Sequence, residues 1–280
     1  MSTAPISSTA IVPDRGRTNA RTNVITEFWR YRELLYFFAW RDIKVRYRQA
    51  VLGAAWAVIQ PLLNMVVFAF IFGRLAHMPS NGIPYPLFSY CALVPWTYFS
   101  GTLGLASNSL TGNTSLLTKV YFPRILLPAG TVLAGLLDFG IATVLLIAMM
   151  IYYHIKVSWL LLLSPLAILL MIVLTLGAGM LMAAMSVKYR DIKYVLPFVI
   201  QLMLFATPII YPSSVVPDRF RPFLALNPVW GMVDCFRACL LPSQPFDFKL
   251  IGISVGVTFV LFAAGLYYFR KSEKTFADII

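Results

Sequence analysis

Residues Trp40–Leu62 read WRDIKVRYRQAVLGAAWAVIQPL, and this junction decides the fold of the chain. Its first part holds four basic residues within about two helical turns: Arg41, Lys44, Arg46 and Arg48. A long apolar stretch then begins at Gly53. Positive charge beside the start of an apolar stretch is typical of the cytoplasmic end of a membrane-spanning helix. The junction therefore predicts a first span that starts on the cytoplasmic side of a membrane.

The composition excludes a water-soluble globule. The chain has 280 residues, of which 59% are hydrophobic and 12% charged, and its mean hydropathy is +0.77. A membrane-spanning helix needs about 20 mostly apolar residues. Six stretches are suitable, the fifth of them short: Gly53–Leu75, Pro86–Leu110, Ile125–Tyr153, Trp159–Val187, Tyr194–Tyr211 and Lys249–Phe269. We therefore predict an all-α integral membrane protein with six transmembrane helices.

Basic residues fall mostly on one side of this topology. Of the 23 lysines and arginines, 17 lie at the N-terminus, in the loops after spans two and four, or at the C-terminus. This distribution predicts that both termini are cytoplasmic. Anionic lipid is enough to explain the net charge of +12, so we predict no nucleic-acid partner. No early apolar segment marks a cleaved signal peptide, and residues 1–23 are predicted to be a disordered cytoplasmic tail.

Residues 24–50 are predicted to form an amphipathic helix and a basic turn ahead of the first span. Within TEFWRYRELLYFFAW (Thr26–Trp40), one helical stripe is apolar: Phe28, Tyr31, Leu35 and Phe38. This spacing predicts a helix in the headgroup region, with its aromatic side chains toward the acyl chains. Such a helix can be a membrane anchor, and its polar face can also dock a cytoplasmic partner. Residues 51–280 then form the six-helix membrane domain.

The segment between spans five and six, Pro212–Phe248, is apolar but interrupted by Pro222 and Pro228. Its pieces are too short to cross a bilayer, and they carry three charged residues: Arg221, Asp234 and Arg237. Broken, re-entrant helices fit this pattern, because irregular backbone at membrane depth survives only where protein covers it or where it borders a water-filled cavity. The pattern favours a pore exit. The three cysteines are interpreted as packing residues.

Three stretches resemble a known family. The first is the Trp40–Leu62 junction, the second is VKYRDIKYVLPFVIQLMLFATPIIYP (Val187–Pro212), and the third is LNPVWGMVDCFRACLL (Leu226–Leu241). In order and spacing they resemble type-2 ABC transporter permeases that export polysaccharides of the O-antigen, capsule or teichoic-acid type. The resemblance implies a homodimer in the bacterial inner membrane, bound to two copies of a separate ATPase subunit. It also implies a lipid-linked cargo, a glycan on undecaprenyl pyrophosphate.

The energy source is predicted to lie outside this chain. The sequence has no GxxxxGK[ST] loop to bind nucleotide phosphates. Ion coupling places ionisable residues within spans, and only Asp138 is clearly at mid-membrane. An external ATPase that carries ATP and Mg²⁺ is the better account. For this chain itself we predict no cofactor, no metal site and no catalytic residue.

Aromatic residues of spans one, two and five are predicted to line a substrate channel. Sugars stack their C–H faces on aromatic rings, so such a tunnel lets a glycan slide. The predicted lining is Trp56, Phe68, Phe72, Tyr90, Trp96, Tyr98, Phe205 and Tyr211. The alternative is that these residues pack the core or anchor the helices at the membrane interface.

Three further groups receive predicted roles. The basic cluster Arg41, Lys44, Arg46 and Arg48 is predicted to attract the lipid pyrophosphate. The ATPase is predicted to couple through the N-terminal helix and a short helix over Leu116–Tyr121, at Tyr31, Arg32, Leu116, Leu117, Lys119 and Tyr121. A gating or structural role is predicted for Asp138, Arg190 and Asp191. Asp138 can instead be satisfied by hydroxyl groups at a helix interface, with Gly135 and Gly140 allowing close approach.

Two other classes of function stay open. A permease of the same fold can export a drug or a lipid. A membrane-embedded enzyme that modifies glycans would need clustered acids or histidines near one membrane face. The chain offers only His77 and His154, each at the outer end of a predicted span.

Overall fold

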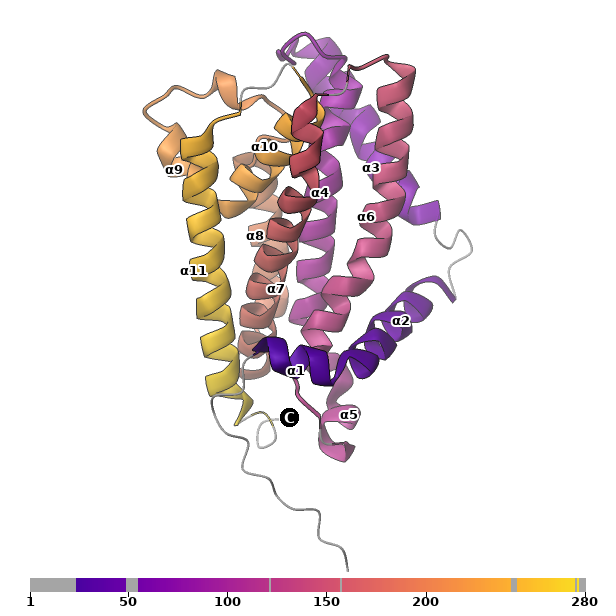
Figure 1. Ribbon diagram of the computed structural model, residues 1–280, viewed down its shortest axis with the longest axis vertical. Helices are drawn as coiled ribbons and strands as arrows, with labels where there is room; N and C mark the ends of the chain where they lie inside the picture. The colour runs from indigo at the N-terminus through magenta and orange to yellow at the C-terminus, as the bar shows by residue number, and fades with distance from the viewer. Residues whose placement is uncertain are drawn as a thin grey trace, which may run out of the picture.

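The fold is a bundle of helices with short helices at both ends (Figure 1). The structure, a computed structural model, describes residues 24–48, 55–120, 122–156, 158–242, 246–274 and 276. In chain order the α-helices are α1 (Val24–Arg30), α2 (Arg32–Arg48), α3 (Trp56–Phe68), α4 (Tyr85–Ser107), α5 (Thr114–Lys119), α6 (Leu126–Tyr152), α7 (Ser164–Lys188), α8 (Ile192–Ala206), α9 (Arg221–Ala225), α10 (Pro228–Leu240) and α11 (Phe248–Glu273). The predicted tail, Gly53 and Tyr121 lie outside the described residues.

Four helical segments are long and apolar enough to cross a membrane. Two of them extend an α-helix with a different helical turn: α3 continues as a π-helix, Ala69–Leu75, and the 3-10 turn Trp159–Leu163 leads into α7. The four are Trp56–Leu75, Leu126–Tyr152, Trp159–Lys188 and Phe248–Glu273. Helix α8 is apolar but shorter, as its sequence predicted. These helices confirm the all-helical, integral membrane fold.

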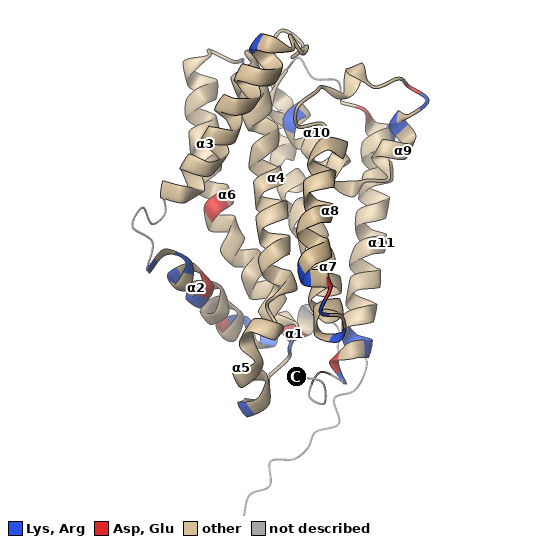
Figure 2. Ribbon diagram, turned by 180° about the vertical axis from the view of Figure 1, so that it is seen from behind, with Lys and Arg blue, Asp and Glu red and all other residues tan. Residues whose placement is uncertain are grey.

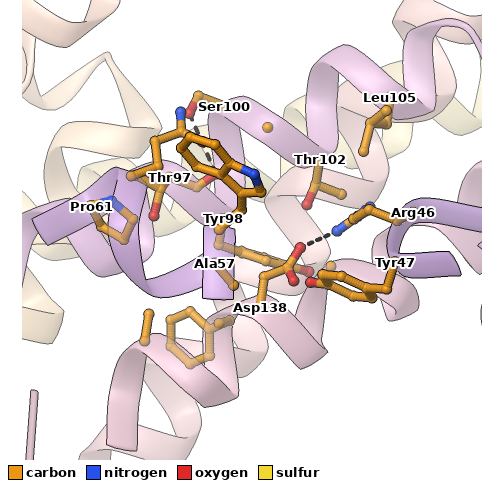
Figure 3. Close-up of a pocket in the computed structure, with 16 residues that line it drawn as sticks. Arg46, Tyr47, Ala57, Pro61, Thr97, Tyr98, Ser100, Thr102, Leu105 and Asp138 are labelled. Atoms are coloured by element: carbon orange, nitrogen blue, oxygen red, sulfur yellow. Dashed lines mark hydrogen bonds and ion pairs between the residues drawn. The ribbon is translucent and has the colours of Figure 1, made fainter. Parts of the chain in front are cut away.

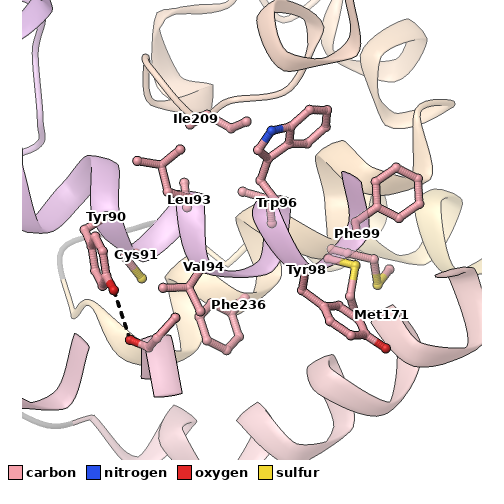
Figure 4. Packing of buried hydrophobic residues seen from close by; sticks show 14 of the residues in the cluster. Tyr90, Cys91, Leu93, Val94, Trp96, Tyr98, Phe99, Met171, Ile209 and Phe236 are labelled. Atoms are coloured by element: carbon pink, nitrogen blue, oxygen red, sulfur yellow. Dashed lines mark hydrogen bonds between the residues drawn. The ribbon is translucent and has the colours of Figure 1, made fainter. Parts of the chain in front are cut away.

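Helix α4 is long enough to cross a membrane but is less apolar than these four helices. It can be less apolar because its surroundings are protein rather than lipid. It contacts α3, α6, α7, α8 and α10, and most of its residues are buried. Figure 4 shows its buried face, where Tyr90, Trp96 and Tyr98 pack among side chains that include Met171 of α7 and Phe236 of α10. The Tyr90 hydroxyl donates to the Ala142 carbonyl at 3.2 Å. Polar groups are tolerated in α4 because neighbouring helices, not lipid, satisfy them.

Helices α7 and α11 approach each other closely at two glycines. A Cβ atom on Gly265 would lie 2.2 Å from the carbonyl oxygen of Gly177. A Cβ atom on Gly177 would lie 2.6 Å from the Cα atom of Phe262. Small residues at such a crossing let two backbones pack in direct contact. The contact fixes the sixth predicted span against the fourth.

The N-terminal stripe packs on protein, so the prediction that it faces the acyl chains is wrong. Phe38 is buried and its ring lies 5.3 Å from that of Phe122. The same cluster includes Leu127 of α6 and Phe269 of α11, and the other stripe residues pack against it. An apolar stripe needs only an apolar neighbour, and here the bundle supplies it. A location in the headgroup region stays a prediction.

The segment between α8 and α11 forms two short helices, as its prolines predicted. Pro222 and Pro228 lie in the first turns of α9 and α10, where a proline costs no helical hydrogen bond. The Asn227 side chain caps α10 by accepting from the Val229 amide at 3.1 Å. Helix α10 packs against α4, α7 and α11 and is almost completely buried.

Charge divides the bundle into two ends. One end, called the basic end here, holds α1, α2, α5 and the last turn of α11, and lysines and arginines gather there (Figure 2). The opposite end, called the far end, holds α9 and α10 together with the connection from α3 to α4 (Figure 1). The clustering agrees with the asymmetry predicted from the sequence.

Candidate functional site

A pocket of about 360 Å³ is lined by residues of α2, α3, α4 and α6. Its walls combine aromatic rings, hydroxyl groups and one ion pair (Figure 3): Arg46, Tyr47, Trp56, Gln60, Thr97, Tyr98, Ser100, Thr102 and Asp138 are among the residues that line it. The pocket is open at its rim, where Trp56 and Leu105 are exposed. A half-open, polar and aromatic hollow next to a basic helix is suited to a ligand that carries both a charged and an apolar part.

The ion pair in this pocket joins Arg46, in the last turn of α2, to Asp138, in the middle of α6. The guanidinium donates from Nη1 to Oδ2 of the carboxylate. The two side chains are 26% and 29% exposed. A carboxylate within a membrane helix is costly unless a partner neutralises it. Arg46 is that partner, so hydroxyl groups alone do not satisfy Asp138.

A second polar contact holds α2 on α6. The Thr131 hydroxyl donates to Asp42 at 3.0 Å, and Arg41 donates to the same carboxylate at 2.8 Å. Gly130 lies under this part of α2, where an added Cβ atom would be 2.9 Å from the Cβ atom of Phe38. The middle of α2 is thus fixed by packing and hydrogen bonds, and its end by the Arg46 ion pair.

Gly135 shapes the wall of the pocket, and Gly140 does not. A Cβ atom on Gly135 would lie 2.3 Å from the Thr102 hydroxyl oxygen and 3.1 Å from the Tyr98 ring. Around Gly140 there is open space. Of the two glycines predicted to allow close approach near Asp138, only Gly135 does so, and it brings α4 against α6.

Two polar atoms of the pocket residues are buried without a hydrogen-bond partner within the part of the chain that the structure describes. They are Oδ1 of Asp138 and the hydroxyl oxygen of Tyr47. Buried polar atoms are almost always paired in proteins, so each exception calls for a physical reason. The pocket therefore has unused hydrogen-bonding capacity beside its ion pair.

The four basic residues predicted to attract pyrophosphate have different surroundings. Only Arg46 lines the pocket. Arg41 pairs with Asp42 and its guanidinium lies 5.1 Å from the centre of the Phe38 ring. The Lys44 ammonium lies 5.5 Å from the centre of the Trp40 ring, and Arg48 is exposed.

The predicted channel aromatics do not form one surface within a single chain. Trp56 and Tyr98 line the pocket, whereas Tyr90 and Trp96 are buried in the bundle. The other four lie on α3, on the π-helix that continues it, and around the end of α8. Phe68 and Phe72 are half-buried and in ring contact with each other, Phe205 is exposed, and the Tyr211 hydroxyl donates to the Phe205 carbonyl. Their assignment to a channel stays a prediction.

The predicted coupling residues gather at the basic end. Tyr31, Leu116 and Leu117 pack against the same cluster that holds the end of α11. Arg32 lies 5.2 Å from the Trp29 ring, and Lys119 is exposed. Polar contacts bind this end together: Arg270 pairs with Glu27, and Arg124 donates to the Glu273 carbonyl at 2.5 Å. Their contact with an ATPase stays a prediction.

Arg190 and Asp191 lie in the turn between α7 and α8, and both are exposed. The Asp191 carbonyl accepts from the Tyr194 and Val195 amides and so begins α8. None of the ion pairs found among the described residues joins Arg190 to Asp191. The gating role predicted for this turn, like that of Asp138, stays a prediction.

A polar network at the far end is not predicted by any sequence pattern described above. Arg237 of α10 is fully buried, and it donates to the carbonyl oxygens of Pro208 and, at 3.4 Å, Ile209. Tyr85 of α4 donates to the next carbonyl, that of Ile210, at 2.6 Å. The only signal in the sequence is a charged residue within an apolar segment. Two helices thus hold the chain where α8 ends.

The long apolar helices, the polar pocket between them and the basic end define a membrane transport protein. Comparison with known sequences gives the family: residues 33–241 match the model of the ABC-2 type transporter, and the chain belongs to this family. It is 30% identical over 92% of its length to the O-antigen export system permease protein RfbA of Myxococcus xanthus, of which the match covers 99%. It is 29% identical over 89% of its length to RfbA of Klebsiella pneumoniae, covering 95% of that protein. It is 23% identical over 84% of its length to the polysialic acid transport protein KpsM of Escherichia coli, covering 91%.

This membership confirms the family that the three sequence stretches resemble. It makes the chain a membrane transport subunit, so the alternative of a glycan-modifying enzyme is not supported. Within the described residues, no group of three or more histidines, cysteines and acids is placed to hold a metal ion.

Proposed function

We propose that this chain is the permease subunit of an ATP-driven exporter that moves a lipid-linked polysaccharide, such as O-antigen on undecaprenyl pyrophosphate, across the bacterial inner membrane. The observation that carries the proposal is the similarity over nearly its whole length to permeases named for O-antigen export. The pocket between α2 and α6 supports it, because a pyrophosphate and an isoprenyl chain need a polar hollow that borders lipid.

The proposed orientation places the basic end in the cytoplasm, together with both termini. Lysines and arginines concentrate on cytoplasmic surfaces of membrane proteins, and α2, α5 and the last turn of α11 carry them here. The substrate then enters beside α2 and leaves at the far end, past α9 and α10. In this orientation Arg46 faces the leaflet in which a cytoplasmic lipid-linked glycan is made.

A homodimer is part of the proposal. Helix α3 and the π-helix that continues it, together with α8, expose apolar faces in the single chain. The exposed residues are Leu63 and Val66 on α3, Phe70 on the π-helix, and Tyr194, Phe198 and Phe205 on α8. A second copy that covered part of these faces would enclose a passage between the two chains. The exposed aromatics Trp56 and Phe205 would then border that passage, where glycan rings can stack on them.

Two copies of an ATPase subunit complete the proposed transporter, and ATP and Mg²⁺ bind there rather than on this chain. The proposed contact surface is the basic end, where α1, α5 and the end of α11 pack on one cluster. Because Arg270 pairs with Glu27, force applied to α1 would reach the sixth predicted span directly.

The test is purification of the tagged full chain from its native membranes in mild detergent. The expected result is a co-purifying subunit with a GxxxxGK[ST] loop, in a one-to-one ratio, and vanadate-sensitive ATP hydrolysis. Deletion of the gene should remove a surface glycan while its lipid-linked precursor accumulates inside. As the control, the wild-type chain should restore the surface glycan in the deletion strain. It should not do so when the phosphate-binding lysine of the partner subunit is replaced. Unchanged surface glycan in the deletion strain would contradict the polysaccharide cargo.

A further inference from the structure

We propose that the Arg46–Asp138 ion pair is a latch between α2 and α6, and that the pyrophosphate group of the lipid-linked substrate opens it by replacing Asp138 as the partner of Arg46. The proposal rests on the proposed function, since it assumes a pyrophosphate-bearing lipid. Beyond the proposed function, it states that the Asp138 carboxylate competes with the substrate for Arg46.

The position of the pair makes it a latch. Along α2, Phe38 is buried against α6 and Asp42 accepts from Thr131, so this half of the helix is fixed. The last turn of α2 is joined to α6 by Arg46 and Asp138. If that pair opens, α2 pivots about its fixed half and does not detach. The pivot widens the pocket toward its exposed rim at Trp56 and Leu105.

The pair is incompletely satisfied, so hydrogen-bonding capacity is left beside it for a second partner. Oδ2 of Asp138 accepts from Arg46, but Oδ1 is buried with no partner among the described residues. The Tyr47 hydroxyl, next to Arg46 in sequence, is also buried and unpartnered there. Both unused atoms belong to residues that line the pocket.

Chemistry favours pyrophosphate over the carboxylate once it arrives. A guanidinium binds phosphate oxygens through two parallel hydrogen bonds, and a diphosphate offers more charge and more acceptor oxygens than one carboxylate. The Tyr47 hydroxyl and the Gln60 amide can donate to the remaining oxygens from the same walls. The hydroxyl groups of Ser100 and Thr102 line the same pocket as the released Asp138.

The test measures the distance between α2 and α6 by paired spin labels on the full chain, purified with its co-purifying ATPase and placed in nanodiscs of zwitterionic lipid. Labels go on cysteines that replace Val45 of α2 and Val144 of α6, which are 72% and 69% exposed. The native cysteines, Cys91, Cys235 and Cys239, are buried, so the added sites react selectively. A pair at Val144 and Val260 of α11 is the reference that should not move.

Four probes separate the possible sources of phosphate: an isoprenyl pyrophosphate, the isoprenyl alcohol of the same chain length, inorganic pyrophosphate, and phosphatidylglycerol in the nanodisc. The expected result is a longer 45–144 distance with the isoprenyl pyrophosphate alone. An equal increase with the alcohol, with inorganic pyrophosphate or with phosphatidylglycerol would overturn the proposed opening by a lipid-linked pyrophosphate.

Two variants test the competition. Asp138→Asn should lengthen the 45–144 distance without ligand and tighten binding of the isoprenyl pyrophosphate roughly tenfold, since no carboxylate competes. The double variant Arg46→Asp with Asp138→Arg should restore the short distance, because the ion pair forms again with its two partners exchanged. A distance that stays long in the double variant, or one that does not lengthen in Asp138→Asn, would overturn the proposal.

The result also separates this proposal from the proposed function. Isoprenyl pyrophosphate that binds to the wild-type chain without any change in the 45–144 distance would refute the latch and leave the substrate class standing. Failure to bind at all would refute both.

Discussion

Two arginine–aspartate neighbourhoods, one at each half of the bundle, use the same residue types in opposite ways. Arg46 and Asp138 meet across α2 and α6, border an open pocket and keep about a quarter of their surface exposed. Arg237 and Asp234 lie together on α10 inside the bundle, and Arg237 has no exposed surface. Arg237 donates to backbone carbonyls after α8, and its guanidinium lies 4.0 Å from the centre of the Phe88 ring. Asp234 accepts from the Ser213 hydroxyl at 3.2 Å.

The difference separates a contact that can change from one that holds the fold. The far-end network fixes the backbone just after α8 through Arg237 and Tyr85, and no ligand can reach it without opening α10. The Arg46–Asp138 pair is the main polar contact of one helix end and lies at a pocket wall. Mutations at the far end should therefore change stability, and those at the pocket should change ligand response first.

The largest effect is expected from Arg237→Met. The change leaves Asp234 without a nearby buried cation and removes the donor to two carbonyl oxygens, which should cost about 3–5 kcal/mol. The measurement is thermal unfolding of the purified chain followed by tryptophan fluorescence. Arg219→Gln, at an exposed arginine of the same end, should leave the unfolding temperature unchanged. A stable Arg237→Met protein would remove the structural half of the comparison.

A smaller effect is expected at one glycine in each neighbourhood. A Cβ atom on Gly231 of α10 would lie 2.1 Å from the Ser254 hydroxyl oxygen, which donates to the Ala225 carbonyl. Gly231→Ala should cost about 2–3 kcal/mol, and Gly135→Ala about 1–2 kcal/mol, because Thr102 can give way toward the pocket. Gly140→Ala, in open space, is the matched control and should be neutral or slightly stabilising. Equal losses at Gly231 and Gly135 would mean that the pocket wall is as rigid as the far end.

A still smaller effect is expected when a tyrosine of the far end or of the pocket loses only its hydroxyl group. Tyr85 donates to Ile210 at 2.6 Å, and Tyr98, at the pocket, donates to Val132 at 3.3 Å. Tyr85→Phe should cost about 1–2 kcal/mol of unfolding free energy and Tyr98→Phe about 0.5 kcal/mol. Denaturant unfolding in detergent would rank them, and the reverse order would place the stronger constraint at the pocket.

The smallest effect is expected from Asp218→Asn. This carboxylate pairs with Arg221 at 2.7 Å on the surface of the far end, where its side chain is 89% exposed. Exposed ion pairs contribute little, so the unfolding free energy should change by less than about 0.5 kcal/mol. A clear loss of stability would show that position at the far end, rather than burial, makes a charge pair structural.

The sequence predicted those features that depend on local pattern. Apolar length located the spans, and the prolines at 222 and 228 located the starts of two short helices. Asp138 was recognised as costly because a lone carboxylate stands out in an apolar helix. The basic turn before the first span was recognised because charge density is visible without a structure.

Pairing between distant segments could not be predicted. Arg46 and Asp138 are 92 residues apart, and each has a plausible role without the other. The stripe that contains Phe38 has the spacing of a lipid-facing helix, yet protein covers it, because hydrophobicity does not distinguish the two apolar environments. The same ambiguity affects Tyr90 and Trp96, which pack in the bundle although their composition also suits a sugar-binding surface.

The enclosure of α4 bears on how the chain is made. Helix α4 contains tyrosines, several serines and threonines, one proline in its first turn and one in its interior. It therefore partitions into lipid less readily than the apolar helices around it. Most of its surface is covered by α6, α7 and α10, all of which leave the ribosome later. We therefore expect the insertion machinery to shelter the nascent α4 until those partners arrive, so that membrane insertion of this protein would depend on delayed release of α4.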